Sequence, residues 1–292
     1  MEHSPHPPHP SLGTLGTPSP LRGEGWVRGL FDSHSHLNFE AFKDDWKEVI
    51  VDCEKNNIWM VNIGSQYETS KRGVEIVRDY KHAFSAVGLH PTHAHEKEHE
   101  FEYEKFAELV RSSKKVVAIG ETGIDFYHST EHFEKQKEIF LQHIRLAKEF
   151  GLALVIHGRN SKDGKVNCYE EIFKIVKKEN VKRAVIHCFI GNVDDAKKFL
   201  ELGYFIGITG IITFKNAQDL QVIAKDIIPL QQLLIETDCP YLAPEPYRGK
   251  RNQPQYVEYV ARKIAELKGK TLEEVAKITF ENAKELFTIR DV

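Results

Sequence analysis

Short apolar runs alternate with longer amphipathic segments along the chain from about residue 30 onward. The apolar runs lie at residues 30–37, 58–65, 82–90, 116–125, 152–157, 183–189, 204–213 and 233–239. Most are nearly continuous in Val, Ile, Leu and Ala, which is typical of strands buried on both faces of a parallel sheet. Eight such strands, each followed by a helical segment, predict an α/β fold of the (β/α)8 barrel type, with one core.

The segments between the runs have the spacing of helices. The apolar positions of residues 131–150 that share one helical face are Phe133, Phe140, Ile144 and Ala147. Gly151 follows as a typical helix stop. Two more helices are predicted after the last run, at residues 254–267 and 272–287, with Thr271 capping the second. An open doubly wound sheet is the alternative, but no Gly-x-Gly-x-x-Gly follows the first run, so dinucleotide binding has no support.

The start of the chain has a different composition. Half of the chain's 12 prolines fall within the first 25 residues, among Gly, Ser, Thr and few apolar residues. Such a segment buries too little apolar surface to offset the entropy of ordering. We therefore expect residues 1–28 to be a disordered tail and residues 29–292 to form the barrel domain. A further hypothesis is that the native protein starts downstream, near Val27.

Charge and cysteine content narrow the functional classes. A net charge of −3 excludes a strongly basic nucleic-acid coat protein. It does not exclude a phosphate-bearing substrate, because bound divalent metals would be the largest charges in a site. The four cysteines have no Cys-x-x-Cys spacing, so we predict no disulfide framework and a cytoplasmic location. No apolar run reaches the roughly 18 residues of a membrane span, so we expect no membrane association. The sequence gives no evidence of an obligate protein partner.

Residues able to bind metal stand at the ends of the apolar runs. His34 and His36 are two positions apart, so in a strand they share one face. The later runs contribute His90, Glu121, His157, His187 and Asp238. The carboxyl ends of barrel strands meet at one mouth, where these side chains would converge. Imidazoles mixed with carboxylates form the ligand set that Zn²⁺ and Mn²⁺ prefer.

The number of ligands predicts two metal ions. We expect the first ion to be held by His34, His36, Glu121 and Asp238, and the second by Glu121, His157 and His187. Two ions bridged by Glu121 would activate a bridging hydroxide and clamp the attacking and leaving oxygens of an in-line displacement. Asp238 would serve as general base and take the proton of the water.

The motifs around these residues are a family signature. They are Asp-Ser-His-Ser-His-Leu at 32–37, Gly-Leu-His-Pro at 88–91, Gly-Glu-Thr-Gly-Ile-Asp at 120–125, Ile-His-Gly-Arg at 156–159, His-Cys-Phe at 187–189 and Glu-Thr-Asp-Cys-Pro-Tyr at 236–241. This set resembles the TatD family of metal-dependent deoxyribonucleases, which belongs to the amidohydrolase-like barrel superfamily. The resemblance covers residues 30 to 287, and Glu121 stands where many related barrels carry a carboxylated lysine.

The resemblance implies a distorted TIM barrel with one to two divalent cations, Zn²⁺, Mn²⁺ or Mg²⁺. The family's metal residues carry over as His34, His36, Glu121, His157, His187 and Asp238. It also implies hydrolysis of phosphodiester bonds, often as a 3′→5′ exonuclease on single-stranded DNA or RNA. Two positions depart from the family: Thr92 replaces a frequent histidine, and Asn160 replaces an acidic residue.

Four further residues are predicted to contact the substrate. His90 and Arg159 lie at strand ends that face the mouth, where a planar guanidinium suits a phosphate. Arg248 and Arg251 belong to a basic loop after the eighth run, where this fold often binds phosphate. A structural histidine, a loop salt bridge and a solvated loop are the respective alternatives. Cys188 and Cys239, which adjoin metal-binding positions, are expected to be packing residues.

A second functional class shares the same chemistry. An activated water attacks carbonyl carbon as well as phosphorus, so hydrolysis of carboxylic esters or amides, such as the removal of an amino acid from tRNA, is the alternative. A non-enzymatic metal-buffering protein is a third reading, and the complete set of ligands argues against it.

Overall fold

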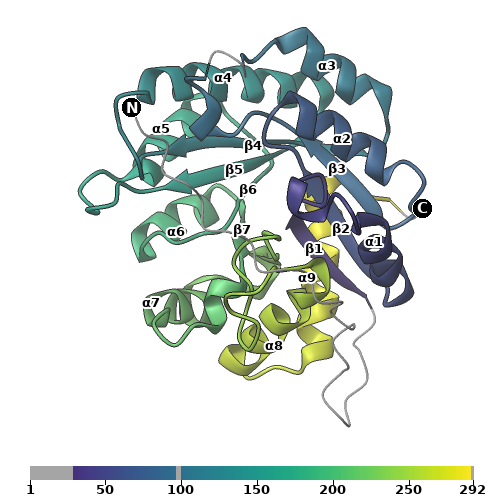
Figure 1. Cartoon of the computed structure of the whole chain (residues 1–292). Helices are drawn as coiled ribbons and strands as arrows, with labels where there is room; N and C mark the ends of the chain where they lie inside the picture. Colours follow the sequence, from purple (N-terminus) through teal and green to yellow (C-terminus); the bar gives the residue numbers. More distant parts are fainter. Residues whose placement is uncertain (1–28, 97–99, 291–292) are drawn as a thin grey trace, which may run out of the picture.

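In a computed structural model, which describes residues 29–96 and 100–290, eight parallel strands pair in chain order (Figure 1). The strands are β1 (Leu30–Ser35), β2 (Ile58–Ile63), β3 (Ala83–Val87), β4 (Val116–Asp125), β5 (Ala153–Arg159), β6 (Ala184–Ile186), β7 (Phe205–Ile208) and β8 (Leu233–Ile235). Each predicted apolar run overlaps one of them, and β5 extends two residues beyond its run. The predicted eight-stranded barrel is thus confirmed, whereas the predicted tail at residues 1–28 lies outside the described residues.

Helices follow the strands and form the outer layer. They are α1 (Trp46–Lys55), α2 (Tyr67–Val77), α3 (Tyr103–Ser112), α4 (Phe133–Phe150), α5 (Cys168–Lys178), α6 (Val193–Glu201), α7 (Gln218–Val222), α8 (Val257–Lys268) and α9 (Leu272–Phe287). Gly151 ends α4 in the left-handed conformation, as predicted from its position. The predicted capping box of α9 is present, with Thr271 accepting from Glu274 N–H. Residues 254–256 form a short 3₁₀ turn, so α8 begins three residues later than predicted.

The barrel closes where the chain continues beyond β8. A bridge pairs Ser35 of β1 with Cys239. The His36 amide donates to the Cys239 carbonyl at 2.9 Å, and the Asp238 amide donates to the His34 carbonyl at 2.9 Å. These bonds place the end of β1 beside the segment after β8, which joins the two ends of the sheet at the mouth of the barrel.

Two apolar layers hold the barrel. One fills the space between the sheet and the surrounding helices. The other lies inside the barrel, where side chains of alternate strand positions meet Leu286 and Phe287 of α9. Phe31 of β1 stacks on Phe287 with ring centroids 6.1 Å apart. α9 packs against this inner layer at the end of the barrel remote from the carboxyl ends of the strands. A polar site is therefore confined to the other end, at the mouth of the barrel.

The first strand departs from strict alternation. Alternation would put Asp32 on the same face as His34, where its carboxylate could support a ligand imidazole. The pairing of β1 with β2 instead shifts register between Asp32 and Ser35. Asp32 therefore accepts hydrogen bonds from Thr237 N–H and Thr237 Oγ1 at 2.8 and 2.6 Å, away from the imidazoles. Asp32 Oδ1 also accepts from His34 N–H at 3.3 Å, so in the described part of the chain its hydrogen bonds come from backbone amides and the Thr237 hydroxyl and not from an imidazole.

Within the described part of the chain, none of the helices combines the length and apolar character that a membrane span needs. All four cysteines are free thiols, and three of them are buried.

Candidate metal centre

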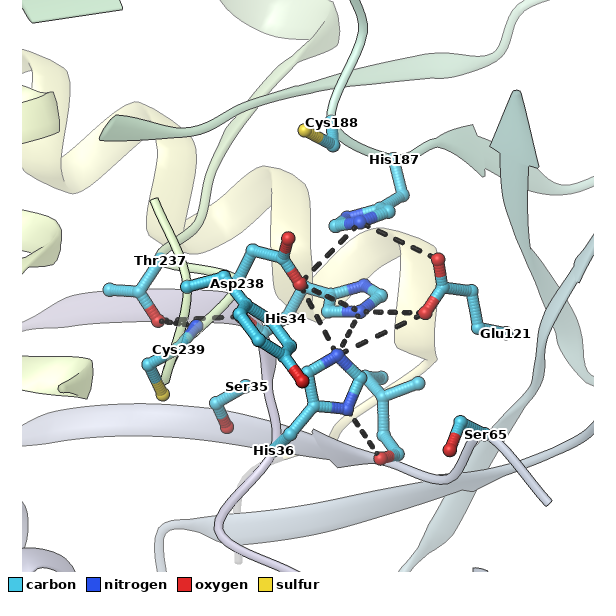
Figure 2. A network of polar contacts seen from close by, with 12 residues as sticks. His34, Ser35, His36, Ser65, Glu121, His187, Cys188, Thr237, Asp238 and Cys239 are labelled. Atoms are coloured by element: carbon cyan, nitrogen blue, oxygen red, sulfur yellow. Dashed lines mark hydrogen bonds and ion pairs between the residues drawn. The ribbon is translucent and has the colours of Figure 1, made fainter. Parts of the chain in front are cut away.

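The side chains of His34, His36, Glu121 and Asp238 form one group, in which each of the two imidazoles lies near both carboxylates. Glu121 Oε2 lies 3.4 Å from His34 Nε2 and 3.9 Å from His36 Nε2. Asp238 Oδ1 lies 3.2 Å from His36 Nε2 and 3.7 Å from His34 Nε2. Figure 2 shows the two imidazoles and the two carboxylates pointing toward one another. These four residues are the set predicted for a first ion.

The other oxygen of Glu121 faces a second group. Glu121 Oε1 lies 2.9 Å from His157 Nδ1, 3.4 Å from His90 Nε2 and 3.7 Å from His187 Nε2. His187 also reaches Asp238 Oδ1 at 3.8 Å, so it stands between the two groups. The structure thus brings together all six predicted ligands. It also brings His90 to the cluster, a residue that was predicted as a substrate contact and not as one of the six ligands.

Each of three imidazoles is oriented by an acceptor on its other nitrogen. His36 Nδ1 is 2.9 Å from the Ile63 carbonyl, and His157 Nε2 is 2.8 Å from Asp125 Oδ2. His187 Nδ1 forms an ion pair with Glu236 Oε1 at 2.9 Å. Such outer contacts fix which nitrogen faces a metal.

The sequence reasoning missed Glu236 and gave Asp125 no firm role. The signal was available for Glu236, because an acid two residues before Asp238 should share its face of the strand.

The backbone at the site takes unusual conformations. Asp238 and Cys188 have φ of 55° and 45°, in the left-handed region that residues with a side chain rarely adopt. Conformations of this kind cost about 1–3 kcal/mol each and cluster at functional sites. The bend at Asp238 directs its carboxylate to the cluster, immediately after β8 ends.

Burial and neighbouring charges set the protonation of the cluster. Burial lowers the pKa of His34 to about 4, so this imidazole is neutral. Burial also acts to lower the pKa of His157 and His187, but nearby carboxylates prevail. Hydrogen bonds to Asp125 and Glu121 raise the pKa of His157 to about 9, and the charges of Glu236 and Glu121 raise that of His187 to about 10. The acidic groups of the cluster therefore attract positive charge, as protons or as a cation.

The donor set fits a metal ion. His34 Nε2 and His36 Nε2 face each other at 3.1 Å, and His34 Nδ1 is buried without a hydrogen-bond partner. The lone pairs of two imidazole nitrogens at this distance repel each other unless a proton or a cation lies near both. Two groups of three side chains that include Glu121 have the spacing of metal ligands. One is His34, His36 and Glu121, and the other is His90, Glu121 and His157. Nitrogen and oxygen donors in this mixture suit Zn²⁺, Mn²⁺ and similar ions.

A family model described as TatD related DNase matches residues 31–288. The chain belongs to the TatD family. An uncharacterized metal-dependent hydrolase, YabD of Bacillus subtilis, is 40% identical over 89% of this chain and 99% of its own length. YcfH of Escherichia coli K12, with the same description, is 33% identical over 89% of this chain and 96% of its own length.

The crystal structure of YjjV, a TatD homolog from Escherichia coli K12, superposes with a TM-score of 0.80 at 26% identity, covering 89% of this chain and 98% of its own. The protein is thus a metal-dependent hydrolase with the TatD barrel fold.

Arg159 lies at the mouth of this TatD barrel beside the cluster. It ends β5, two residues after His157, and its guanidinium carbon lies 3.5 Å from the centroid of the Tyr127 ring. Both side chains are half-buried. The family's frequent second histidine is replaced by Thr92, whose hydroxyl lies 2.7 Å from His90 Nδ1. That contact orients His90 with Nε2 toward Glu121.

The two arginines of the basic loop have different surroundings. Arg248 is exposed, stacks on Phe214 at 4.2 Å and lies 4.0 Å from Glu245. Arg251 makes two hydrogen bonds to Asp45, at 2.9 and 2.6 Å, and a third to the Ala41 carbonyl. A substrate contact by Arg251 would require this pair to open, so the structure gives Arg251 a role in tying the loop to the start of α1.

The two cysteines beside the cluster differ in their surroundings. Cys239 is fully buried, and its thiol points away from the imidazoles in Figure 2. Cys188 Sγ lies 3.7 Å from Thr209 Oγ1, and it falls within 4.8 Å of ligand atoms of His187 and Asp238. Burial raises the pKa of the Cys188 thiol, so it is a neutral group rather than a ready thiolate ligand.

Proposed function

We propose that this TatD hydrolase cleaves phosphodiester bonds of single-stranded DNA or RNA, releasing nucleotides from the 3′ end. The observation that carries the proposal is the division of the cluster by Glu121, whose two oxygens face two groups of nitrogen donors. The family model's description as a DNase supports the same chemistry. Arg159 at the mouth, whose guanidinium makes no ion pair with any described residue, adds a donor for a phosphate.

The proposed metal residues are His34, His36, Glu121, His157, His187 and Asp238. Divalent cations held by them would supply Lewis acidity to a water and to a phosphoryl oxygen. His187 stands between the two groups, with its Nε2 within 3.8 Å of both carboxylates. The outer partners of the imidazoles keep the nitrogens directed inward.

The side chains around the metal residues divide the remaining work. Asp238 is the most solvent-accessible carboxylate of the cluster, with 16% of its side chain exposed, compared with 6% for Glu121. It is therefore placed to take a proton from an attacking water. His90 Nε2 and the Arg159 guanidinium face the mouth and would hold phosphate oxygens, since both offer N–H donors. Arg248, farther out on the rim, would meet the strand beyond the cleaved bond.

The test is cleavage of single-stranded DNA labelled at the 3′ or the 5′ end. Protein stripped of metal by chelation is reloaded with Mg²⁺, Mn²⁺ or Zn²⁺, and Glu121→Gln is compared with Glu273→Gln, an exposed glutamate on α9. We expect cleavage that depends on metal, persists in Glu273→Gln and is lost in Glu121→Gln, with the 3′ label released first.

Intact strands with every metal, from protein shown to contain metal, would contradict the proposal. That result would favour the hydrolysis of carboxylic esters or amides, for which aminoacyl-tRNA is the substrate to try. The four free thiols suit a reducing compartment, and we propose the cytoplasm as the location.

A further inference from the structure

An exposed aromatic ring stands on one side of the mouth. Tyr241 follows β8, and 56% of it is exposed, the largest fraction for any large hydrophobic side chain among the described residues. Its amide donates to the Asp238 carbonyl at 3.0 Å. Its ring centroid lies 6.4 Å from that of Phe39, which stacks on His36 at 4.3 Å. The exposed ring is thus connected to the metal centre through two direct packing contacts.

Arg159, at the end of β5, lies on another side of the mouth and has no charged partner among the described residues. Within the part of the chain that the structure describes, the Arg159 guanidinium makes no hydrogen bond or ion pair and rests on the face of Tyr127. A guanidinium carries five N–H donors, so this arginine has donors to offer a ligand. Asp125 ties the pair to the cluster, because its two oxygens contact Tyr127 N–H and His157 Nε2 at 2.8 Å each.

The two features lie across the mouth from each other. The sheet runs in the order β1 to β8, and the segment after β8 returns to β1. In such a ring of eight strands, the β8–β1 side lies opposite the β4–β5 side. Tyr241 and Phe39 belong to the first side, and Tyr127 and Arg159 to the second, with Glu121 reaching donors from both. A ligand over the cluster would therefore meet an aromatic wall and a cationic wall together.

We propose that these two walls form a subsite for one nucleotide of a single strand, in which Tyr241 stacks on the base and Arg159, held flat by Tyr127, binds the adjoining phosphate. The inference rests on the proposed function and specifies how that site recognises its substrate.

A base in a duplex is covered on both faces by its neighbours, whereas an unpaired base has a face free for a tyrosine. Stacking on Tyr241 would thus select single strands without reading sequence, since every base has an aromatic face.

The experiment pairs each wall with the part of the substrate that it is proposed to touch. Oligonucleotides lacking one base at a time, and others with one neutral methylphosphonate at a time, are hydrolysed by metal-loaded protein. Tyr241→Ala is compared with Tyr241→Phe, which keeps the ring, and with Val222→Ala, an apolar side chain on α7 with a similar 52% exposure. Fluorescence of 2-aminopurine placed in the strand reports stacking independently of hydrolysis.

We expect Tyr241→Ala to lower kcat/KM on ordinary strands by roughly 5- to 150-fold, the range measured for base–aromatic stacking. Tyr241→Phe and Val222→Ala should stay within about twofold of wild type, in line with substitutions that remove no contact. On the strand that lacks the base proposed to stack on Tyr241, Tyr241→Ala should cause no further loss of kcat/KM. Arg159→Ala should lose roughly 10- to 100-fold on ordinary strands and little on the methylphosphonate at the matching position.

The inference is overturned if the loss in Tyr241→Ala is equally large with and without the base, or if 2-aminopurine emission is the same in Tyr241→Ala and wild type. In that case wild-type protein still degrades the strands, and the proposed function stands. If wild-type protein degrades no strand with any metal, the proposed function fails and this subsite fails with it.

Discussion

Glu236 is a buried acid that lies outside the ligand set and contacts one of its imidazoles. Its Oε1 accepts from Cys188 N–H at 2.6 Å and pairs with His187 Nδ1 at 2.9 Å, and Ser33 Oγ donates to its Oε2 at 3.1 Å. The chain makes room for it with a glycine, since a Cβ on Gly207 would lie 2.5–2.7 Å from the three carboxylate atoms. Glu236→Gln keeps the shape of the side chain and removes its charge.

The size of the effect follows from these contacts. A hydrogen bond to a charged group contributes about 1.5–3 kcal/mol, compared with about 0.5–1.5 for a neutral one, so the hydrogen bond from Cys188 N–H loses about 1 kcal/mol. The ion pair with His187 loses its negative partner altogether. The contact with His187 should appear in metal affinity, at the lower end of the 10- to 100-fold loss that is typical of such outer partners. The contact with Cys188 should appear in stability, as a Tm lower by about 2–4 °C.

Two measurements separate these losses. Titration calorimetry of metal-stripped protein with Mn²⁺ gives the affinity, and thermal unfolding without metal gives the stability. Glu273→Gln is the control for a general loss of one negative charge. Gly207→Ala should produce the same loss of affinity by pushing Glu236 aside, at a cost of about 1–3 kcal/mol in stability. Combining it with Glu236→Asp, whose shorter side chain leaves space, should cost less than the sum of the two.

An unchanged Mn²⁺ affinity in Glu236→Gln would refute the reasoning, because His187 would then be oriented by something else. Equal effects in Glu236→Gln and Glu273→Gln would refute it as well, since the loss would reflect net charge alone.

Three other predictions concern the protonation of the cluster histidines, the Arg251–Asp45 ion pair and the N-terminal cap of α9. Because the pKa values of His157 and His187 are raised to about 9 and about 10, both are protonated near pH 7 and must lose protons to bind metal. Binding heats should then vary with the ionisation enthalpy of the buffer, and affinity should weaken as the pH falls; identical heats in all buffers would contradict this. Arg251→Ala and Asp45→Ala should each lower the free energy of unfolding by about 1 kcal/mol, whereas a higher KM in Arg251→Ala alone would return Arg251 to the substrate. Thr271→Ala should cost about 1 kcal/mol by removing a helix cap, and an unchanged Tm would show that the end of α9 is held by packing instead.

The strands and the ligand set could be read from the chain because their signals are local. A buried parallel strand is an apolar run, and a side chain at its end must face the mouth, so His34, Glu121 and Asp238 could be placed together without coordinates. Strand alternation then failed at Asp32, where the register shift in β1 turns the side chain away. Irregular pairing depends on the neighbouring strand and leaves no period in the sequence.

The contacts of the outer residues could not be read in the same way. Arg251 reaches Asp45 across 206 residues, and Glu236 depends on the absence of a side chain at Gly207 on the neighbouring strand. Both are products of packing between distant segments. The basic residues of this loop form one cluster in the sequence, but their contacts differ in the structure. Arg248 stacks on Phe214, whereas Arg251 pairs with Asp45.

We propose that the cluster around Glu121 holds the metal of this hydrolase. The most direct measurement is an anomalous difference map from crystals soaked in Mn²⁺, collected for wild type and Glu121→Gln. We expect strong density within coordination distance of Glu121 in wild type, on one or both sides of its carboxylate, and its loss in the variant. Density elsewhere on the protein with none at Glu121, or equal density in both proteins, would contradict the claim.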